Sequence, residues 1–228
     1  MIHAQARRSA VEVPTPGAHL AGDLVVPPGA RGVVAFAHGS GSSRHSPRNL
    51  QVAATLQEGG LATLLFDLLT PAEEVRDDLT AEHRFDIPLL TRRLAGAVDW
   101  LRRIPATAHL PIGLFGASTG AAAALGAAAA RPDAVAAVVS RGGRPDLAGA
   151  ETLARVRAPT LLIVGGLDEG VIELNRAAAA QIRCRREVLI VPGATHLFPE
   201  PGKLASVARL ARAWFLEHCA PEEAGPQP

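Results

Sequence analysis

The chain of 228 residues has little of what stabilises many secreted proteins. Its two cysteines, Cys184 and Cys219, are too few for a disulfide framework and lack the close spacing of a metal-binding pair. Two reduced thiols are typical of a protein in a reducing compartment. We therefore expect a cytoplasmic protein.

Long apolar runs and an excess of charge are also missing. No run of about 18 apolar residues occurs, which excludes a membrane-spanning helix. Residues 121–130 are apolar, but they are short and alanine-rich, as in a buried helix. Residues 1–8 are polar and lack the apolar segment of a signal peptide. The formal net charge of +1 gives no basic footprint, so we expect neither a nucleic-acid nor a membrane partner.

Aromatic residues make up only 4% of the chain, and tyrosine is absent. The sequence also lacks a long insertion, because the two candidate lid segments, residues 70–83 and 144–158, are both modest. We therefore expect a shallow, accessible site for small esters rather than long lipids. Leu197 and Phe198 either line this site or pack in the core.

What the sequence does contain is a regular alternation of apolar runs and helical segments. Most of the runs are wholly apolar, which is typical of a parallel sheet buried on both faces. We predict one α/β domain over residues 1–219, with a mostly parallel central sheet flanked by helices, and a disordered tail at 220–228. The expected strands are residues 11–13, 19–26, 33–37, 62–66, 112–115, 135–139, 160–164 and 188–191, and the expected helices are 47–58, 86–104, 119–130 and 204–218.

Three chemically active side chains follow apolar runs and so reach the same edge of the predicted sheet. Ser118, Asp168 and His196 come shortly after the fifth, seventh and eighth of these runs. A serine hydroxyl needs a base to take its proton, and a histidine held by a carboxylate is such a base. Glu169, next to Asp168, is the main alternative for the acid.

The serine lies in the segment Gly116-Ala117-Ser118-Thr119-Gly120, between an apolar run and an alanine-rich helix. A serine presented above a sheet needs a sharp turn, and a glycine two residues away on either side leaves room where side chains would collide. The alternative is that Ser118 is only the N-cap of the following helix. In the same way, Asp168 could serve only as the N-cap of a helix near Val171.

The Gly-x-Ser-x-Gly segment resembles the nucleophile elbow of the α/β-hydrolases. Residues 38–41, His-Gly-Ser-Gly, resemble the oxyanion loop of that family, and the loops with Asp168 and His196 resemble its acid and base loops. Residues 19–219 fit the minimal version of the α/β-hydrolase fold, and their compactness resembles the dienelactone hydrolase-like branch. Most namesake enzymes of that branch use a cysteine nucleophile, whereas this chain offers Ser118.

An oxyanion hole of two backbone N–H groups is expected beside the serine. One N–H group belongs to Thr119, at a helix N-terminus whose dipole favours negative charge, and the other belongs to Ser40. Neither side chain is expected to take part. The resemblance implies that His38 supports this loop and does not act as the base. The alternative for the Gly-Ser run after His38 is a flexible loop or a phosphate-binding nest.

Three arginines, Arg44, Arg141 and Arg144, lie in loops at the expected strand ends. Guanidinium groups match the geometry of carboxylates and phosphates. These side chains therefore either hold an anionic group of the substrate or are simply solvated.

The predicted activity is that of a serine hydrolase that cleaves small carboxylic esters through an acyl-enzyme. Ser118 is the nucleophile, His196 the base and Asp168 the acid. This chemistry needs no metal or organic cofactor, and the expected partner is a small-molecule ester. The same groups suit a thioesterase or a small peptidase, and a non-catalytic binding module on a hydrolase scaffold is a further alternative. The acyl group, the leaving group and the oligomeric state stay open.

Overall fold

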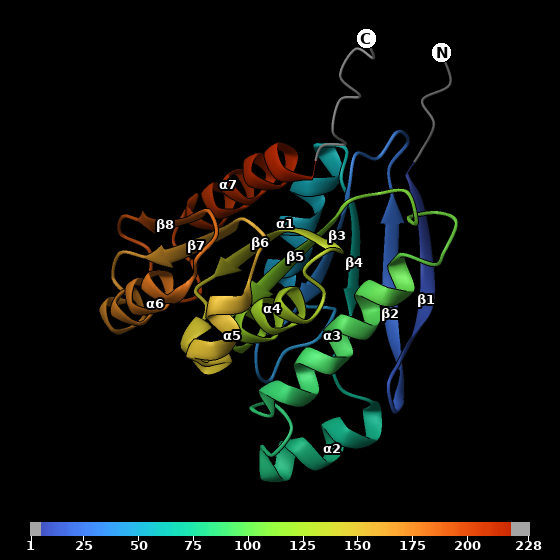
Figure 1. The fold of residues 1–228 in the computed structure, drawn as a ribbon, viewed down its shortest axis with the longest axis horizontal. Helices are drawn as coiled ribbons and strands as arrows, with labels where there is room; N and C mark the ends of the chain where they lie inside the picture. Colours follow the sequence, from blue (N-terminus) through green and yellow to red (C-terminus); the bar gives the residue numbers. More distant parts are fainter. Residues whose placement is uncertain (1–5, 220–228) are drawn as a thin grey trace.

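In the computed structural model, which describes residues 6–219, eight strands form one sheet with helices on both faces (Figure 1). The strand order is β1-β2-β4-β3-β5-β6-β7-β8. The first two strands run antiparallel to their neighbours, and β3 to β8 are mutually parallel, as predicted. The strands are β1 Arg7–Thr15, β2 Ala18–Val26, β3 Val33–Ala37, β4 Ala62–Phe66, β5 Ile112–Ala117, β6 Val135–Arg141, β7 Thr160–Gly165 and β8 Arg186–Val191.

The central strands are apolar throughout because both faces of the sheet are covered. Every residue of β3, β4, β5 and β7 is buried. Alternate side chains of β3 enter separate cores, with Val34 and Phe36 on one face and Val33 and Ala35 on the other. Successive side chains of a strand point to opposite faces of the sheet, and here both faces are covered by helices.

Four helices lie close to where the sequence predicts them. Helix α1 (Pro47–Glu58) packs against α7 (Lys203–His218) on one face, and α3 (Ile87–Leu101) packs against α4 (Thr119–Ala130) on the other (Figure 1). Helix α1 begins with Pro47 at its first turn, and the Ser46 hydroxyl accepts a hydrogen bond from the Asn49 N–H group at 3.4 Å. Proline and a serine cap at these positions favour a helix start.

Helix α4 consists almost entirely of small residues and is buried along nearly its whole length. Small side chains let its backbone approach its neighbours closely. At Gly126, an added Cβ atom would lie 2.5 Å from Thr91 Oγ1 of α3. The short alanine-rich run noted in the sequence is therefore the central helix against the sheet, as expected.

Three further elements were not predicted from the sequence. Helix α2 (Pro71–Thr80) lies inside the first candidate lid segment, and a 3₁₀ turn (Pro145–Ala148) and the short helix α5 (Ala150–Arg155) lie inside the second. Helix α6 runs over Glu169–Gln181, where the sequence suggested only a helix near Val171. Both candidate lids are thus short structured connections.

The carboxyl ends of the parallel strands meet at one edge of the sheet, where the loops after β3, β5, β6, β7 and β8 gather. Within residues 6–219, no helix has both the length and the hydropathy that crossing a bilayer requires. The tail predicted to be disordered, residues 220–228, lies outside the described residues, as do residues 1–5.

Candidate active site

Ser118 stands on a strained turn between β5 and α4. Its backbone has φ +50° and ψ −121°, a conformation that is costly for a residue with a side chain. The flanking glycines are required: a Cβ atom at Gly116 would lie 2.4 Å from Ala121 Cα, and one at Gly120 would lie 2.2 Å from the Ala37 carbonyl oxygen. The expected elbow is therefore present, and the glycines serve the purpose predicted for them.

The Ser118 side chain does not cap the helix that it precedes. It makes no capping hydrogen bond to α4, although Ser118 occupies the N-cap position. The side chain is half-buried. The hydroxyl is thus left available for chemistry, and the capping alternative loses its support.

Asp168 and His196 form a direct contact across the ends of β7 and β8. The distance from His196 Nδ1 to Asp168 Oδ2 is 2.6 Å. In this arrangement the Nδ1–H group donates to the carboxylate, which leaves Nε2 free to accept a proton. Asp168 makes no side-chain cap to α6, and the alternative acid Glu169 is exposed.

The backbone between the two loops fixes this pair. The Leu167 N–H group donates to the Ala194 carbonyl oxygen at 2.9 Å, which joins the loop after β7 to the loop after β8. A Cβ atom at Gly165 would lie 2.4 Å from the same carbonyl oxygen, so only glycine permits this approach. Close loop packing therefore holds the histidine beside its carboxylate.

The loop after β6 lies between Ser118 and His196. The Ser118 N–H group donates to the Arg141 carbonyl oxygen at 3.3 Å. At the next residue, Gly142, a Cβ atom would lie 3.7 Å from His196 Cε1 and 2.8 Å from the His196 carbonyl oxygen. The serine and the histidine thus share one edge of the sheet, while no hydrogen bond joins their side chains among the described residues.

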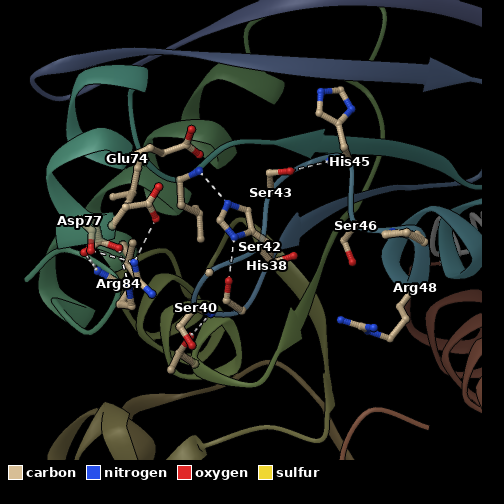
Figure 2. Close-up of a pocket in the computed structure, with 18 residues that line it drawn as sticks. His38, Ser40, Ser42, Ser43, His45, Ser46, Arg48, Glu74, Asp77 and Arg84 are labelled. Carbon is tan, nitrogen blue, oxygen red and sulfur yellow. Dashed lines mark hydrogen bonds and ion pairs between the residues drawn. The ribbon is translucent and has the colours of Figure 1, made fainter. Parts of the chain in front are cut away.

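The loop after β3 contacts the elbow through Gly39 and Ser40. A Cβ atom at Gly39 would lie 3.1 Å from Ser118 Cβ. The Ser40 N–H group donates to Thr119 Oγ1 at 2.9 Å, a bond drawn in Figure 2. The sequence predicted that both residues act only through their backbone N–H groups. In the structure the Thr119 hydroxyl also takes part, as the acceptor that receives the Ser40 N–H group.

His38 holds this loop in place from below. Its Nδ1 atom lies 3.0 Å from the Gly39 carbonyl oxygen, and its Nε2 atom accepts the Leu68 N–H group at 3.1 Å. These partners define a neutral ring with its proton on Nδ1. Burial lowers the pKa of His38 from its ordinary value, against smaller opposing effects of the Gly39 hydrogen bond and the Asp67 charge. His38 therefore has the supporting position expected for it.

A cavity of about 480 Å³ opens beside the elbow (Figure 2). It lies between the loop after β3, the start of α1 and helix α2, and its lining includes Ser40, Ser46, Arg48, Glu74 and Thr119. Burial and the charges of Asp67 and Asp78 raise the pKa of Glu74. One wall is thus acidic, and the opposite wall carries Arg48.

The three arginines proposed from the sequence do not form one cluster. Arg44 is ion-paired with Asp67 and Asp23, and Arg144 forms a two-bond ion pair with Asp146. These partners already satisfy the two guanidinium groups, which corrects their grouping with Arg141. The Arg141 side chain is 5% exposed and pairs with no carboxylate among the described residues. Sequence reasoning missed Arg48, which lies in the first turn of α1 and lines the cavity.

The sequence left open whether Phe198 and Leu197 line the site or pack in the core, and the structure gives them different surroundings. Phe198 is fully buried in the core beneath α7, with φ +56°. Leu197 is 44% exposed. Neither side chain lines the cavity beside the elbow.

The sheet order, the strained turn after β5 and the two loops that follow β7 and β8 together define an α/β-hydrolase fold. No protein-family model matches the chain. Among solved structures, a dienelactone hydrolase from Anabaena variabilis is 56% identical, with a TM-score of 0.93 over 95% of this chain and 100% of that one. The chain therefore belongs to the dienelactone hydrolase family.

Other similar proteins extend the comparison. Est1E from Butyrivibrio proteoclasticus is 18% identical, with a TM-score of 0.77 over 92% of this chain and 98% of that one, and so shares the fold. A protein of Mycobacterium tuberculosis, provisionally named a phosphoribosyl transferase, is 58% identical over 207 residues, which are 90% of this chain. The chain spans about half the length, 46%, of that curated relative.

Proposed function

We propose that this chain is a serine hydrolase that cleaves small carboxylic esters through an acyl-enzyme on Ser118. The observation that carries the proposal is the 2.6 Å contact between His196 and Asp168, formed at the same sheet edge as the strained serine turn. Family membership supports hydrolysis as the general reaction. The serine nucleophile and the ester substrate are our inference from the site.

In this mechanism, His196 Nε2 takes the proton of the Ser118 hydroxyl while Ser118 Oγ bonds to the ester carbonyl carbon. The carbonyl π electrons move to the oxygen, which becomes an oxyanion. The intermediate then breaks its bond to the leaving alcohol, and the imidazolium gives that alcohol its proton. Water, activated by the same histidine, attacks the acyl-enzyme and releases the acid with Ser118 restored.

Asp168 orients the imidazole and stabilises its positive charge during both steps. We assign the binding of the oxyanion to the backbone N–H groups of Thr119 and Ser40. The Ser40 N–H group already donates to Thr119 Oγ1 at 2.9 Å. During the reaction the oxyanion and this hydroxyl would both accept from the same N–H group. In related chemistry, losing one such donor costs roughly 3 kcal/mol of barrier.

Other reactions of the same groups stay as alternatives. A thioesterase or a small peptidase would use the same serine, histidine and aspartate, and a binding module would use none of them. The phosphoribosyl transferase name belongs to relatives about twice as long as this chain. The strained serine and the Asp–His contact favour acyl transfer over that reaction for the part described here.

Labelling with a fluorophosphonate probe tests the proposal directly. We expect the native protein to gain one covalent adduct, located on Ser118 by peptide mass spectrometry. The Ser118→Ala variant should fold and remain unlabelled. A folded native protein that takes no label would refute the serine mechanism and favour the binding module. Graded p-nitrophenyl esters and thioesters would then rank the acyl groups.

A further inference from the structure

Two arginines of the described residues are buried, and only one of them has a carboxylate partner. Arg93, 3% exposed, donates two hydrogen bonds to Glu73 at 2.6 Å. Arg141, 5% exposed, reaches only Asn49 Oδ1, at 3.4 Å, while its Nε and Nη1 atoms have no partner. A buried charge without a counter-ion costs several kcal/mol. The fold therefore places a cation where a negative group is missing.

A second guanidinium lies beside this one. Arg48 lies in the first turn of α1, and Figure 2 shows its side chain at the cavity. Its Nε atom is buried and without a partner, and no ion pair to Arg48 forms within residues 6–219. Burial and the charge of Arg48 lower the pKa of Arg141 to about 10, so Arg141 stays charged at neutral pH. The two guanidinium groups are therefore close enough to repel each other, and neither forms an ion pair among the described residues.

Arg141 lies next to the serine turn. The Arg141 carbonyl oxygen accepts the Ser118 N–H group, and Arg141 pairs with Ala117 across the sheet. The Arg141 guanidinium reaches the first turn of α1 through Asn49, and the N-terminal end of a helix attracts anions. Arg48 is half-buried and lines the cavity, whereas Arg141 is buried behind the lining residues and is not itself one of them. An anion held by Arg141 would therefore be bound by the residue whose backbone contacts the proposed nucleophile.

We propose that Arg48 and Arg141, with the first turn of α1, bind a phosphoryl group carried by the ester that the site cleaves. The inference rests on the proposed function, because it names the substrate class of the same site. A phosphate monoester carries about −1.5 to −2 charges and three acceptor oxygens at neutral pH. It therefore matches two guanidinium groups better than a carboxylate with a single charge.

Phosphate binding can be measured without catalysis. Calorimetry on the Ser118→Ala protein should show binding of inorganic phosphate, and adding either Arg48→Gln or Arg141→Met should weaken it about tenfold or more. The matched control is Arg176→Gln, an exposed arginine on α6 paired with Glu173, which should leave binding unchanged. Absent phosphate binding, or binding that neither substitution weakens, would overturn the site. If Arg141→Met fails to fold, Arg48→Gln decides alone.

Three matched p-nitrophenyl esters then identify the substrate class. They are the esters of butanoate, succinate and 3-phosphonopropanoate, which differ in the group at the far end of the acyl chain. We expect the native enzyme to prefer the phosphonate ester to the butanoate ester by about tenfold in kcat/KM, and either arginine substitution to abolish that ratio. An equal preference for succinate would overturn the assignment to a phosphoryl group. Phosphate binding together with three inert esters would refute the proposed hydrolysis and leave the anion site standing.

Discussion

The Ser40 N–H group donates to the Thr119 hydroxyl. In the proposed mechanism, the backbone N–H groups of Ser40 and Thr119 also bind the oxyanion. Thr119 is 4% exposed, so its hydroxyl is a fixed part of the elbow. The neighbouring Gly41 has φ +63°, and glycines on either side give the loop backbone freedom. We interpret the hydroxyl as the anchor that holds the Ser40 N–H group near the reacting carbonyl.

Thr119→Val tests this anchor with little change in volume. We expect kcat to fall about tenfold and the unfolding free energy to drop by about 1 kcal/mol, because the Ser40 N–H group loses its acceptor in a partly buried hydrogen bond. Kinetics with a p-nitrophenyl ester and urea unfolding measure the two effects. Thr119→Ser, which keeps the hydroxyl, is the control. A rise in kcat for the valine variant would show instead that the hydroxyl competes with the oxyanion.

His38 gives the fold a defined pH dependence. Burial lowers its pKa from the ordinary value of 6.5, so the unfolded chain binds a proton at a higher pH than the folded protein does. The free energy of unfolding should therefore be insensitive to this group above pH 6.5 and should decrease as the pH falls below it. Urea titrations on both sides of that pH measure the slope. His38→Asn should lose this part of the slope, and an unchanged slope would contradict the assignment.

The individual site residues were predictable to very different degrees. Ser118, Asp168 and His196 were found because each follows an apolar run, and the chain order of such runs is visible in the sequence. The roles of the arginines were not visible, because they depend on partners that folding supplies. Arg44 forms an ion pair with Asp67, whereas Arg141 pairs with no carboxylate among the described residues. Neither result can be predicted from the neighbouring sequence.

At the level of elements, one ion pair connects the start of helix α2 to helix α3. Arg93 of α3 donates to both Glu73 carboxylate oxygens and to the Leu68 carbonyl oxygen, which fastens the start of α2. Burial acts to raise the pKa of Glu73, but hydrogen bonds from Arg93 and Thr70 lower it to about 2. Helix α2 supplies Glu74, Asp77 and Asp78 to the cavity wall, so this ion pair supports the wall as well.

Glu73→Gln should therefore loosen α2. We expect a loss of about 3 kcal/mol, because the buried Arg93 keeps its charge without a counter-ion. Urea unfolding measures the loss, and hydrogen exchange should be faster in α2 than elsewhere. The matched control is Glu82→Gln, which breaks the exposed ion pair with Arg76 and should cost less than about 1 kcal/mol. Equal losses in the two variants would contradict a special role for the buried pair.

The junction of β3, β5 and α4 is the tightest contact of the elbow. At Gly120, an added Cβ atom would lie 2.2 Å from the Ala37 carbonyl oxygen and 2.6 Å from that of His38. Gly120→Ala should therefore destabilise the protein by about 2 kcal/mol or more and lower kcat. Gly170→Ala in α6, where nothing lies within 4 Å, should be neutral or slightly stabilising. Melting temperatures and ester kinetics of both variants measure the difference.

The missed helix shows where the sequence prediction fell short at this scale. Residues 70–83 were treated only as a modest candidate for a lid, and no helix was predicted there. The segment begins with Thr70 and Glu73, whose side chains and backbones cap one another at the start of α2. This capping box was a helix signal in the sequence. Because the spacing of Thr70 and Glu73 was not used, the helix was not predicted.

At the scale of the whole molecule, the class of the sheet was predictable, but the strand order was not. Wholly apolar runs between helices indicate a parallel sheet, because both faces must be covered. The placement of β4 between β2 and β3 depends on long-range pairing. The cytoplasmic location stays a prediction from the two cysteines.

The all-but-featureless sequence of α4 has a consequence for how this protein tolerates change. A run of alanines and glycines looks like filler, yet here its smallness sets the distance between the sheet and the helix that begins at the nucleophile. Enlarging Gly120 or Gly126 would force α4 away from β3 or from α3, respectively. The least distinctive stretch of the chain is therefore one with little room for larger side chains.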